Sequence, residues 1–299
     1  MSLEKAAPWT RREFLRAAVK WSAGAGLATA AYGGVFERTH VVVRRVDVAL
    51  ERLPEAFDGL TIAQLSDLHY HPYFSAGVIR HAVELVEGLK PDLVALTGDF
   101  VTVSAFRNYD RKAAAGAIPC AELLAPLKAK LGVYAVLGNH DSHTDPGLVT
   151  EALTSGGVQV LHNGAVPLER DGARIWLAGV GDVLAGSARL DATLKPIPDS
   201  EAVVLLAHEP DFADEVARHS VDLQLSGHSH GGQVNLPLVG PPALPELGRK
   251  YPRGLRRVGR MALYTNVGLG TIIVPIRVLA TPEVTLLTLR AQKEKRSAS

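Results

Sequence analysis

The sequence has a single cysteine, Cys120, among its 299 residues. One cysteine excludes an internal disulfide and a cysteine-rich zinc site. The sequence also has no surplus of positive charge, because 32 lysines and arginines are balanced by 31 aspartates and glutamates. A general nucleic-acid-binding surface is therefore not indicated.

Internal repeats and an interdomain linker are also missing from the sequence. With 47% hydrophobic and 21% charged residues, the chain is typical of a globular protein that buries one large core or two modest ones. We expect a signal or anchor segment with its linker at residues 1–38 and one domain at residues 39–291. The polar tail at residues 292–299 is expected to be disordered.

The N-terminal segment carries Arg11 and Arg12 directly before Glu13, Phe14 and Leu15. A weakly apolar run follows at residues 17–34, rich in alanine and glycine. This order resembles a twin-arginine export signal, with a possible cleavage site at residues 28–30. It predicts contact with the twin-arginine export machinery and a location in the periplasm or on the outer face of the cytoplasmic membrane. An ordinary amphipathic or membrane-anchoring helix is the alternative.

From His40 onward, short β-rich runs alternate with helical ones, which is typical of a layered α/β domain. One helix is expected to begin after Ser75, which would cap it, and to end before Pro91. A second is expected at residues 113–130, bent or broken by Pro119 and Pro126. The expected strands are residues 41–43, 46–50, 60–65, 93–96, 133–136, 158–161, 175–178, 203–207 and 221–225. Residues 233–289 are expected to be rich in strands.

Five of these expected strands end in polar groups that suit a metal site. The α/β sheets of proteins place functional groups at the carboxyl ends of their strands. Any one such residue has a simpler explanation as a cap, a turn residue or a core histidine. Five in a row make chance improbable. The residues at these ends are Asp67 and His69, Asp99, Asn139 to Asp141, His208, and finally His228 and His230.

In this order the motifs D-x-H, G-D, G-N-H-D, H and G-H-x-H resemble those of the calcineurin-like metallophosphoesterases, in particular their exported or membrane-associated phosphodiesterase branch. The resemblance implies an αββα sandwich of two mixed β-sheets flanked by helices. It also implies two divalent metal ions. Mixed aspartate, asparagine and histidine ligation accepts manganese, iron, zinc or cobalt. The first ion would take Asp67, His69, Asp99 and His230. The second would take Asp99 again, with Asn139, His208 and His228. Thr102 stands where many members carry a second acid.

The charges of such a site suit a phosphate ester. Two divalent ions bring about +4, Asp67 and Asp99 return about −2, and a hydroxide leaves about +1. Metal-activated hydroxide is then the nucleophile. His140 is the candidate to protonate the leaving oxygen or to stabilise the transition state. Asp141 is expected either to orient His140 or to act as a turn cap.

Two other functional classes fit part of the sequence. Residues 227–231 match G-x-S-x-G, the nucleophile elbow of serine hydrolases, with Ser229 as the nucleophile. No helix-forming segment follows, and no histidine lies after His230, so the triad has no support. A catalytically inactive metal-binding interaction module is disfavoured because Asn139 and His140 are both present.

We therefore expect a phosphoesterase that cleaves a phosphodiester or pyrophosphate-type bond in the cell envelope, on a lipid-linked or cell-wall-linked phosphate ester. A UDP-2,3-diacylglucosamine pyrophosphatase-like lipid enzyme is an alternative suggested by the wider family. His71 is expected near the mouth of the site. A membrane surface is a further possible partner, although a solvated loop explains the basic cluster equally well. The cluster consists of Arg249, Lys250, Arg253, Arg256 and Arg257.

Overall fold

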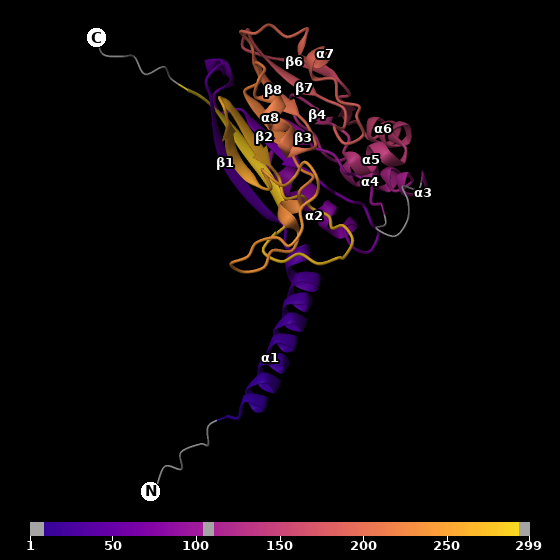
Figure 1. Cartoon of the computed structure of the whole chain (residues 1–299). Coiled ribbons are helices and arrows are strands. Elements are labelled where there is room, and N and C mark those ends of the chain that lie inside the picture. Colours follow the sequence, from indigo (N-terminus) through magenta and orange to yellow (C-terminus); the bar gives the residue numbers. More distant parts are fainter. Residues whose placement is uncertain (1–8, 104–110, 293–299) are drawn as a thin grey trace, which may run out of the picture.

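Two six-stranded β-sheets packed face to face form the centre of the protein, with helices on their outer faces (Figure 1). This computed structural model describes residues 9–103 and 111–292. The predicted C-terminal tail lies outside the described residues except for Gln292. The αββα sandwich of two mixed sheets expected from the sequence is confirmed.

The first sheet has the strand order β1-β12-β2-β3-β4-β5. The pairs from β2 to β5 are parallel, whereas β12 runs antiparallel to β2. This arrangement brings the carboxyl ends of β2, β3 and β4 to one edge. The strands are β1 (Val42–Leu50), β2 (Thr61–Leu65), β3 (Leu93–Leu96), β4 (Val133–Ala135), β5 (Gln159–Val160) and β12 (Glu283–Ala291).

The second sheet has the order β10-β11-β9-β8-β7-β6, in which β7, β8, β9 and β11 are parallel neighbours. The ends of β8 and β9 therefore also point to a common edge. The amide of Gln64 in the first sheet donates to the carbonyl of Ser226 in the second at 2.9 Å, next to that edge. The strands are β6 (Gly164–Arg170), β7 (Ala173–Gly179), β8 (Ala202–Leu206), β9 (Leu223–Ser226), β10 (Gly254–Val258) and β11 (Met261–Thr265).

Three layers of apolar side chains hold the sandwich together. The central layer lies between the sheets and joins side chains such as Ile62 and Leu93 to Leu206 and Leu225. An outer layer packs helices on each sheet. Strands covered on both faces read as continuous apolar runs, which is why β3 and β8 were recognisable in the sequence. The helices of the domain are α2 (Ala76–Leu89), α3 (Arg111–Ala114), α4 (Ala117–Leu124), α5 (Asn139–Thr144), α6 (Pro146–Ser155), α7 (Leu190–Leu194) and α8 (Ala213–Val216).

Several elements differ from the sequence-based expectation for local physical reasons. Ser75 precedes α2 but does not cap it, because its hydroxyl instead donates to the carbonyl of His69 at 2.8 Å. In place of the helix expected at residues 113–130 there are two shorter helices, α3 and α4, which are separated by Ala115 and Gly116, and α4 ends at Leu124, two residues before Pro126. The strand β6 was missed because it contains Pro167. It is an edge strand, where a residue without an N–H is tolerated.

The N-terminal helix α1 (Arg11–Ala31) projects from one end of the domain with all its side chains outside the core (Figure 1). Its first turn is closed by a capping box between Thr10 and Glu13. Residues that follow it pack on the domain, since the buried Glu37 accepts a hydrogen bond from the backbone of Ala280 at 2.9 Å. Within the described residues, no helix is both long and apolar enough to cross a membrane.

Candidate metal centre

The predicted site residues converge at the edge where the strand ends of the two sheets meet. Asp67, Asp99 and Asn139 follow strands of the first sheet, and His208 and His228 follow strands of the second. Three overlapping groups bring ligand atoms within 4.8 Å of one another. They are Asp67 with His69 and His230, His69 with Asp99 and His140, and Asp99 with His208 and His228.

The backbone at this edge is held in a conformation that non-glycine residues seldom adopt. Left-handed φ costs such a residue about 1–2 kcal/mol, so it persists only where the surrounding structure enforces it. Backbone of this kind gathers at functional sites. The residues and their φ values are Asp67 (48°), His69 (42°), Asp99 (57°), His228 (67°) and His230 (52°).

Two glycines allow the loops to approach one another closely. A Cβ atom on Gly227 would lie 1.8 Å from Oγ of Ser66 and 2.3 Å from Oδ2 of Asp67. A Cβ atom on Gly138 would lie 2.3 Å from Oδ1 of Asp99. Both contacts are far inside van der Waals distance, so the two carboxylates keep their positions only because glycine stands opposite them.

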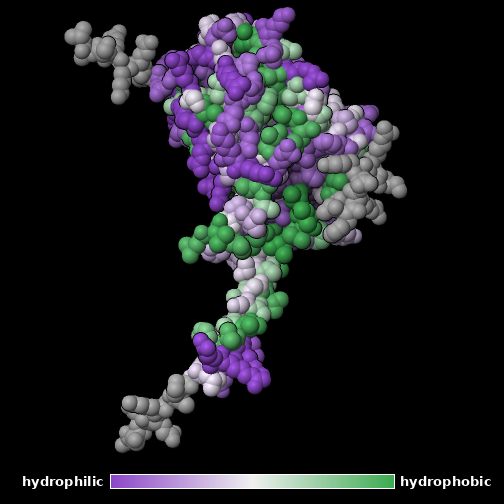
Figure 2. All heavy atoms as spheres, viewed as in Figure 1, coloured by the Kyte–Doolittle hydropathy of each residue, from purple (hydrophilic) through white to green (hydrophobic). Residues whose placement is uncertain are grey.

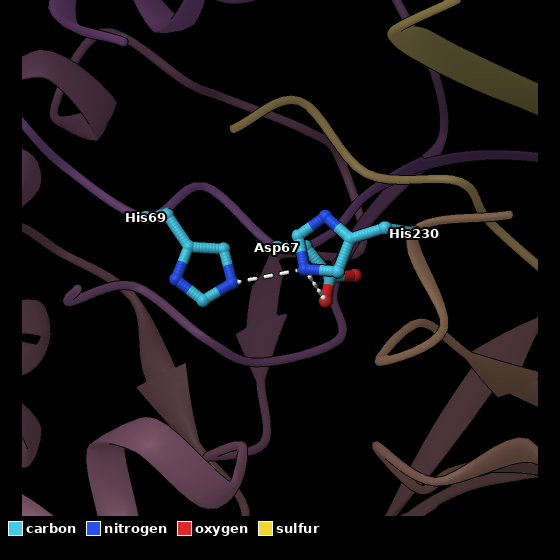
Figure 3. A group of neighbouring side chains, drawn as sticks. All are labelled: Asp67, His69 and His230. Atoms are coloured by element: carbon cyan, nitrogen blue, oxygen red, sulfur yellow. Dashed lines mark hydrogen bonds and ion pairs between the residues drawn. The ribbon is translucent and has the colours of Figure 1, made fainter. Parts of the chain in front are cut away.

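In the first group, Nε2 of His230 lies 3.3 Å from Oδ1 of Asp67 and 3.1 Å from Nε2 of His69 (Figure 3). Burial lowers the pKa of His69 to about 3 and that of His230 well below its ordinary value. Both imidazoles are therefore neutral at pH 7. Two neutral ring nitrogens and a carboxylate oxygen that face one point are a donor set for a divalent cation.

In the third group, Nε2 of His208 lies 3.2 Å from Oδ2 of Asp99. The same carboxylate oxygen is 3.4 Å from Nε2 of His69, so Asp99 stands between the first and third groups. Asn139 joins the third group through Oδ1, which lies 3.0 Å from Nδ1 of His228. Among the described residues, Nε2 of His208 is buried and makes no hydrogen bond of adequate geometry, which suits a nitrogen that would bind a metal.

The outer nitrogens of three rings fix which nitrogen faces the site. Nδ1 of His69 lies 3.1 Å from the carbonyl of Val101, and Nδ1 of His208 lies 2.6 Å from that of Thr97. In His228 it is Nε2 that meets a carbonyl, at 2.7 Å from Glu246. A carbonyl can only accept, so each of these outer nitrogens carries a proton, and the inner nitrogen is the one that can bind a metal.

The charges at Asp99 and His208 depend on each other. Burial opposes the ionisation of Asp99, but His208 and His140 outweigh it and hold the pKa of the carboxyl well below its ordinary value. Burial also disfavours a charge on His208, yet Asp99 and Asp67 raise the pKa of that imidazole well above its ordinary value. A cation that binds His208 must therefore displace a proton from it.

Arg277 supports the site from behind and was not anticipated from the sequence. It is fully buried, and burial lowers its pKa to about 10, so it stays charged at pH 7. Its guanidinium donates to the carbonyls of Val267, Gly270 and Ala280, and Nη2 lies 3.5 Å from Nδ1 of His230. One signal was available, since Arg277 is the only charged residue of the stretch 267–282.

His140 lies at the open side of the site. Its Nε2 is 4.0 Å from Oδ2 of Asp99, and its ring meets that of His69 edge-on, with 4.7 Å between the centroids. Its Nδ1 accepts a hydrogen bond from the backbone of Val103 at 3.3 Å. An imidazole that accepts at Nδ1 carries a proton on Nε2, which is the nitrogen that faces the candidate ligands.

Asp141 bonds to backbone N–H groups, which fits the second of the two roles expected for it, that of a turn cap. Its two oxygens accept hydrogen bonds from the backbone N–H groups of Gly138, Asp99, Phe100 and Val101, at 2.8–3.1 Å. Among the described residues, no hydrogen bond joins it to the ring of His140. Burial and the nearby Asp99 raise the pKa of Asp141 to about 7. Asp141 thus ties the loop after β3 to the loop after β4.

Ser229 has no catalytic partner in the structure. Its buried hydroxyl donates to the carbonyl of Pro252 at 2.6 Å and accepts from the backbone of Gly231. No histidine ring nitrogen among the described residues bonds to it. The serine-hydrolase alternative therefore lacks its general base.

The other residues singled out in the sequence take separate places. His71 lines a cavity of about 260 Å³ beside His69, together with Phe74 and Ile273. In the basic cluster, Lys250 is paired with Asp214 at 2.7 Å, and Arg257 donates to the carbonyl of Ala49. These residues therefore do not form one free cationic patch.

A family model of the calcineurin-like phosphoesterases matches residues 60–232, which include every candidate ligand. The chain belongs to this family. Its members use two divalent metal ions, and the clustered aspartates and histidines of the site are suitable ligands. The protein is therefore a metallophosphoesterase, a hydrolase of phosphoric esters.

Relatives extend the match over most of the chain. The uncharacterized metallophosphoesterase YkuE of Bacillus subtilis is 34% identical over 291 residues, which cover 94% of this chain and 98% of that protein. The phosphodiesterase YaeI of Escherichia coli is 35% identical over 231 residues, which cover 75% of this chain and 80% of that protein. A dimetal phosphatase from Danio rerio aligns with a TM-score of 0.49 at 13% identity, covering 79% of this chain and 94% of that one. The assignment rests on the sequence matches.

Replacing Asp141 by alanine is expected to loosen two loops of the site at once. Four buried N–H groups would lose their acceptor, so the free energy of unfolding should fall by about 3 kcal/mol or more. Urea denaturation measures this loss, and metal analysis should show reduced metal content. The matched control is Asp145→Ala, which removes only the cap of α6 and should cost about 1 kcal/mol with metal content unchanged. Equal losses in both variants would refute the role of Asp141.

Proposed function

We propose that the protein hydrolyses a phosphodiester or pyrophosphate-type bond at a dinuclear metal centre. Asp67, His69, Asp99 and His230 hold one ion. Asp99, Asn139, His208 and His228 hold the other. The observation that carries this proposal is the position of Asp99, whose Oδ2 lies 3.4 Å from Nε2 of His69 and 3.2 Å from Nε2 of His208. One carboxylate oxygen thus serves both groups.

When bound, two divalent ions lower the pKa of water and stabilise negative charge on phosphate oxygens. The chain itself supplies the geometry and the proton. The left-handed loops fix the ligands, and Arg277 holds the loop behind His230. His140 presents Nε2–H at the open side of the site, where it can protonate the leaving oxygen or stabilise charge on it.

A diester or pyrophosphate has a substituent on each side of the reacting phosphorus, and both must be accommodated. The cavity beside His69 offers room for one of them, and its walls are largely apolar, with Phe74, Ile272 and Val274 among them. The relative YaeI is named a phosphodiesterase. These two observations support a diester over a monoester. They also keep a UDP-2,3-diacylglucosamine pyrophosphatase-like lipid enzyme as the second candidate, because its substrate carries apolar chains.

Export by the twin-arginine route is a separate part of the proposal. Arg11 and Arg12 begin an exposed helix that is independent of the core, so the export machinery can reach them. Export would place the site in the periplasm or on the outer face of the cytoplasmic membrane, where lipid-linked and cell-wall-linked phosphates are available substrates.

The Asp99→Ala variant tests the metal centre. Both groups lose their shared oxygen, so metal analysis should show loss of both ions, and hydrolysis of bis(4-nitrophenyl) phosphate should disappear. A chelator should abolish hydrolysis by the unaltered chain in the same way. Ser229→Ala is the matched control and should retain metal-dependent hydrolysis. Activity that persists in Asp99→Ala but is lost in Ser229→Ala would overturn the metal mechanism.

His140→Gln tests the proton donor. Glutamine keeps a polar side chain but cannot transfer a proton, so kcat should fall by about 10²–10⁴-fold while two metals remain bound. The control is His81→Gln, on the exposed face of α2, for which kcat should not change. Unchanged kcat in a fully metal-loaded His140→Gln chain would remove His140 from the catalytic step.

Replacing Arg11 and Arg12 together by lysine tests export. The charge stays the same, but the arginine pair that identifies the signal is lost, so the chain should accumulate in the cytoplasm of the producing cells. Fractionation followed by immunodetection measures this, with Lys20→Arg as the control that alters a basic residue outside the pair. Equal export of the two variants would refute the twin-arginine route.

A further inference from the structure

Several of the most exposed apolar side chains gather at one end of the domain, where α1 joins it. Figure 2 shows hydrophobic surface at this end, below a largely hydrophilic body. The side chains come from the loop before α2, the loop after His230 and the loop before β12. We call this set the loop-tip surface. It consists of Tyr73, Phe74, Leu236, Leu238, Val239, Ile273, Val274 and Leu279.

Hydrogen bonds join two of the three loops directly and the third through the segment that follows α1. The side-chain amide of Gln233 donates to the carbonyls of Ile272 and Val274 at 3.0 and 3.1 Å, and accepts from the backbone of Ile272 at 2.8 Å. In the segment after α1, Arg38 donates to the carbonyl of Phe74 at 2.8 Å, and the carbonyl of Gly33 accepts from the backbone of Arg277 at 3.1 Å. The exposed side chains are therefore displayed by a hydrogen-bonded frame.

Three of these residues combine exposure with a left-handed backbone. Leu238 (φ 67°), Ile273 (φ 61°) and Leu279 (φ 52°) are 108%, 72% and 55% exposed, respectively. Glycine or asparagine is the usual residue at such positions, and a β-branched isoleucine is among the least favoured. At these three positions the left-handed backbone costs conformational free energy, and the apolar side chain is left in water. A binding partner that buries these side chains explains both features.

The charges around the surface identify the chemistry of the partner. The stretches 70–76, 233–245 and 267–282 contain no aspartate or glutamate, and the one arginine in them, Arg277, is buried. Arg38 and Arg253 lie at the rim, the latter bonded to the carbonyl of Leu279. Apolar tips with a cationic rim suit a bilayer that contains anionic lipids. Two copies of the chain would place like charges against each other.

We infer that the loop-tip surface docks on an anionic lipid bilayer. Side chains on separate loop tips insert individually, which a fluid interface accepts without a complementary shape. Ile273, Val274 and Phe74 also line the cavity beside His69, so docking turns the mouth of the site toward the lipid. In this orientation a phosphate ester of a lipid would be the accessible substrate, and that part of the inference rests on the proposed function. The inference that the surface binds the bilayer is independent of the proposed function.

The test is flotation of the full chain with vesicles of phosphatidylcholine and phosphatidylglycerol. The variant is the double change Leu238→Asn and Leu279→Asn, at two left-handed positions that lie outside the cavity beside His69. Asparagine removes the apolar side chain but tolerates this backbone, so the melting temperature should stay the same or rise. Vesicle binding should weaken by about ten-fold or more. A purely structural role would instead lower the melting temperature.

The matched control carries Ile118→Asn and Leu255→Asn, two exposed apolar residues on α4 and β10, and should bind vesicles as the unaltered chain does. The helix α1 is present in every chain, so equal binding of the loop variant and the unaltered chain would overturn the proposal. So would a change in oligomeric state without a change in vesicle binding. Hydrolysis of bis(4-nitrophenyl) phosphate should be the same in all three chains. If the unaltered chain lacks this activity, the proposed function fails while the vesicle result still stands.

Discussion

The burial of the Asp99 carboxylate between His69 and His208 is the constraint on which the rest of the site depends. A carboxylate without solvent must be compensated by nearby positive charge or by donors. In the protein alone, His208 provides this charge by holding a proton. A bound cation takes over the same role, so the site exchanges one form of compensation for another and the fold around it need not change.

The two sheets make this exchange possible because they deliver ligands from rigid strand ends. The loop after β3 and the loop after β4 share Asp141, and the loop behind His230 is held by Arg277. Each of these two ionisable side chains, Asp141 and Arg277, is buried and bonded to backbone groups. The hydrogen bonds of Asp141 and Arg277, which are not metal-ligand candidates, therefore stabilise the loops that hold several left-handed residues. Positioning and metal binding are distributed over different residues.

The sequence was sufficient to predict the layered α/β fold and the residues that meet at the strand ends, because buried strands are apolar runs and ligands follow them directly. It was insufficient where the signal was tertiary. The edge strand β6 was hidden by Pro167, and the bonds of Asp141 to the loop after β3 depend on residues 40 positions apart. Arg277 gave only a weak signal as a lone charge. Exposure at left-handed positions such as Leu238 cannot be read from a sequence at all.

The place of β12 in the first sheet sets the order in which the protein can fold. This last strand, Glu283–Ala291, lies between β1 and β2, two strands from the beginning of the domain. The two early strands cannot pair through it until residues 283–291 have left the ribosome. Contacts this distant in sequence close slowly, because the loop entropy is lost before the pairing is gained. The first sheet is consequently completed only once β12 is present, and until then β1 and β2 each have an unpaired edge.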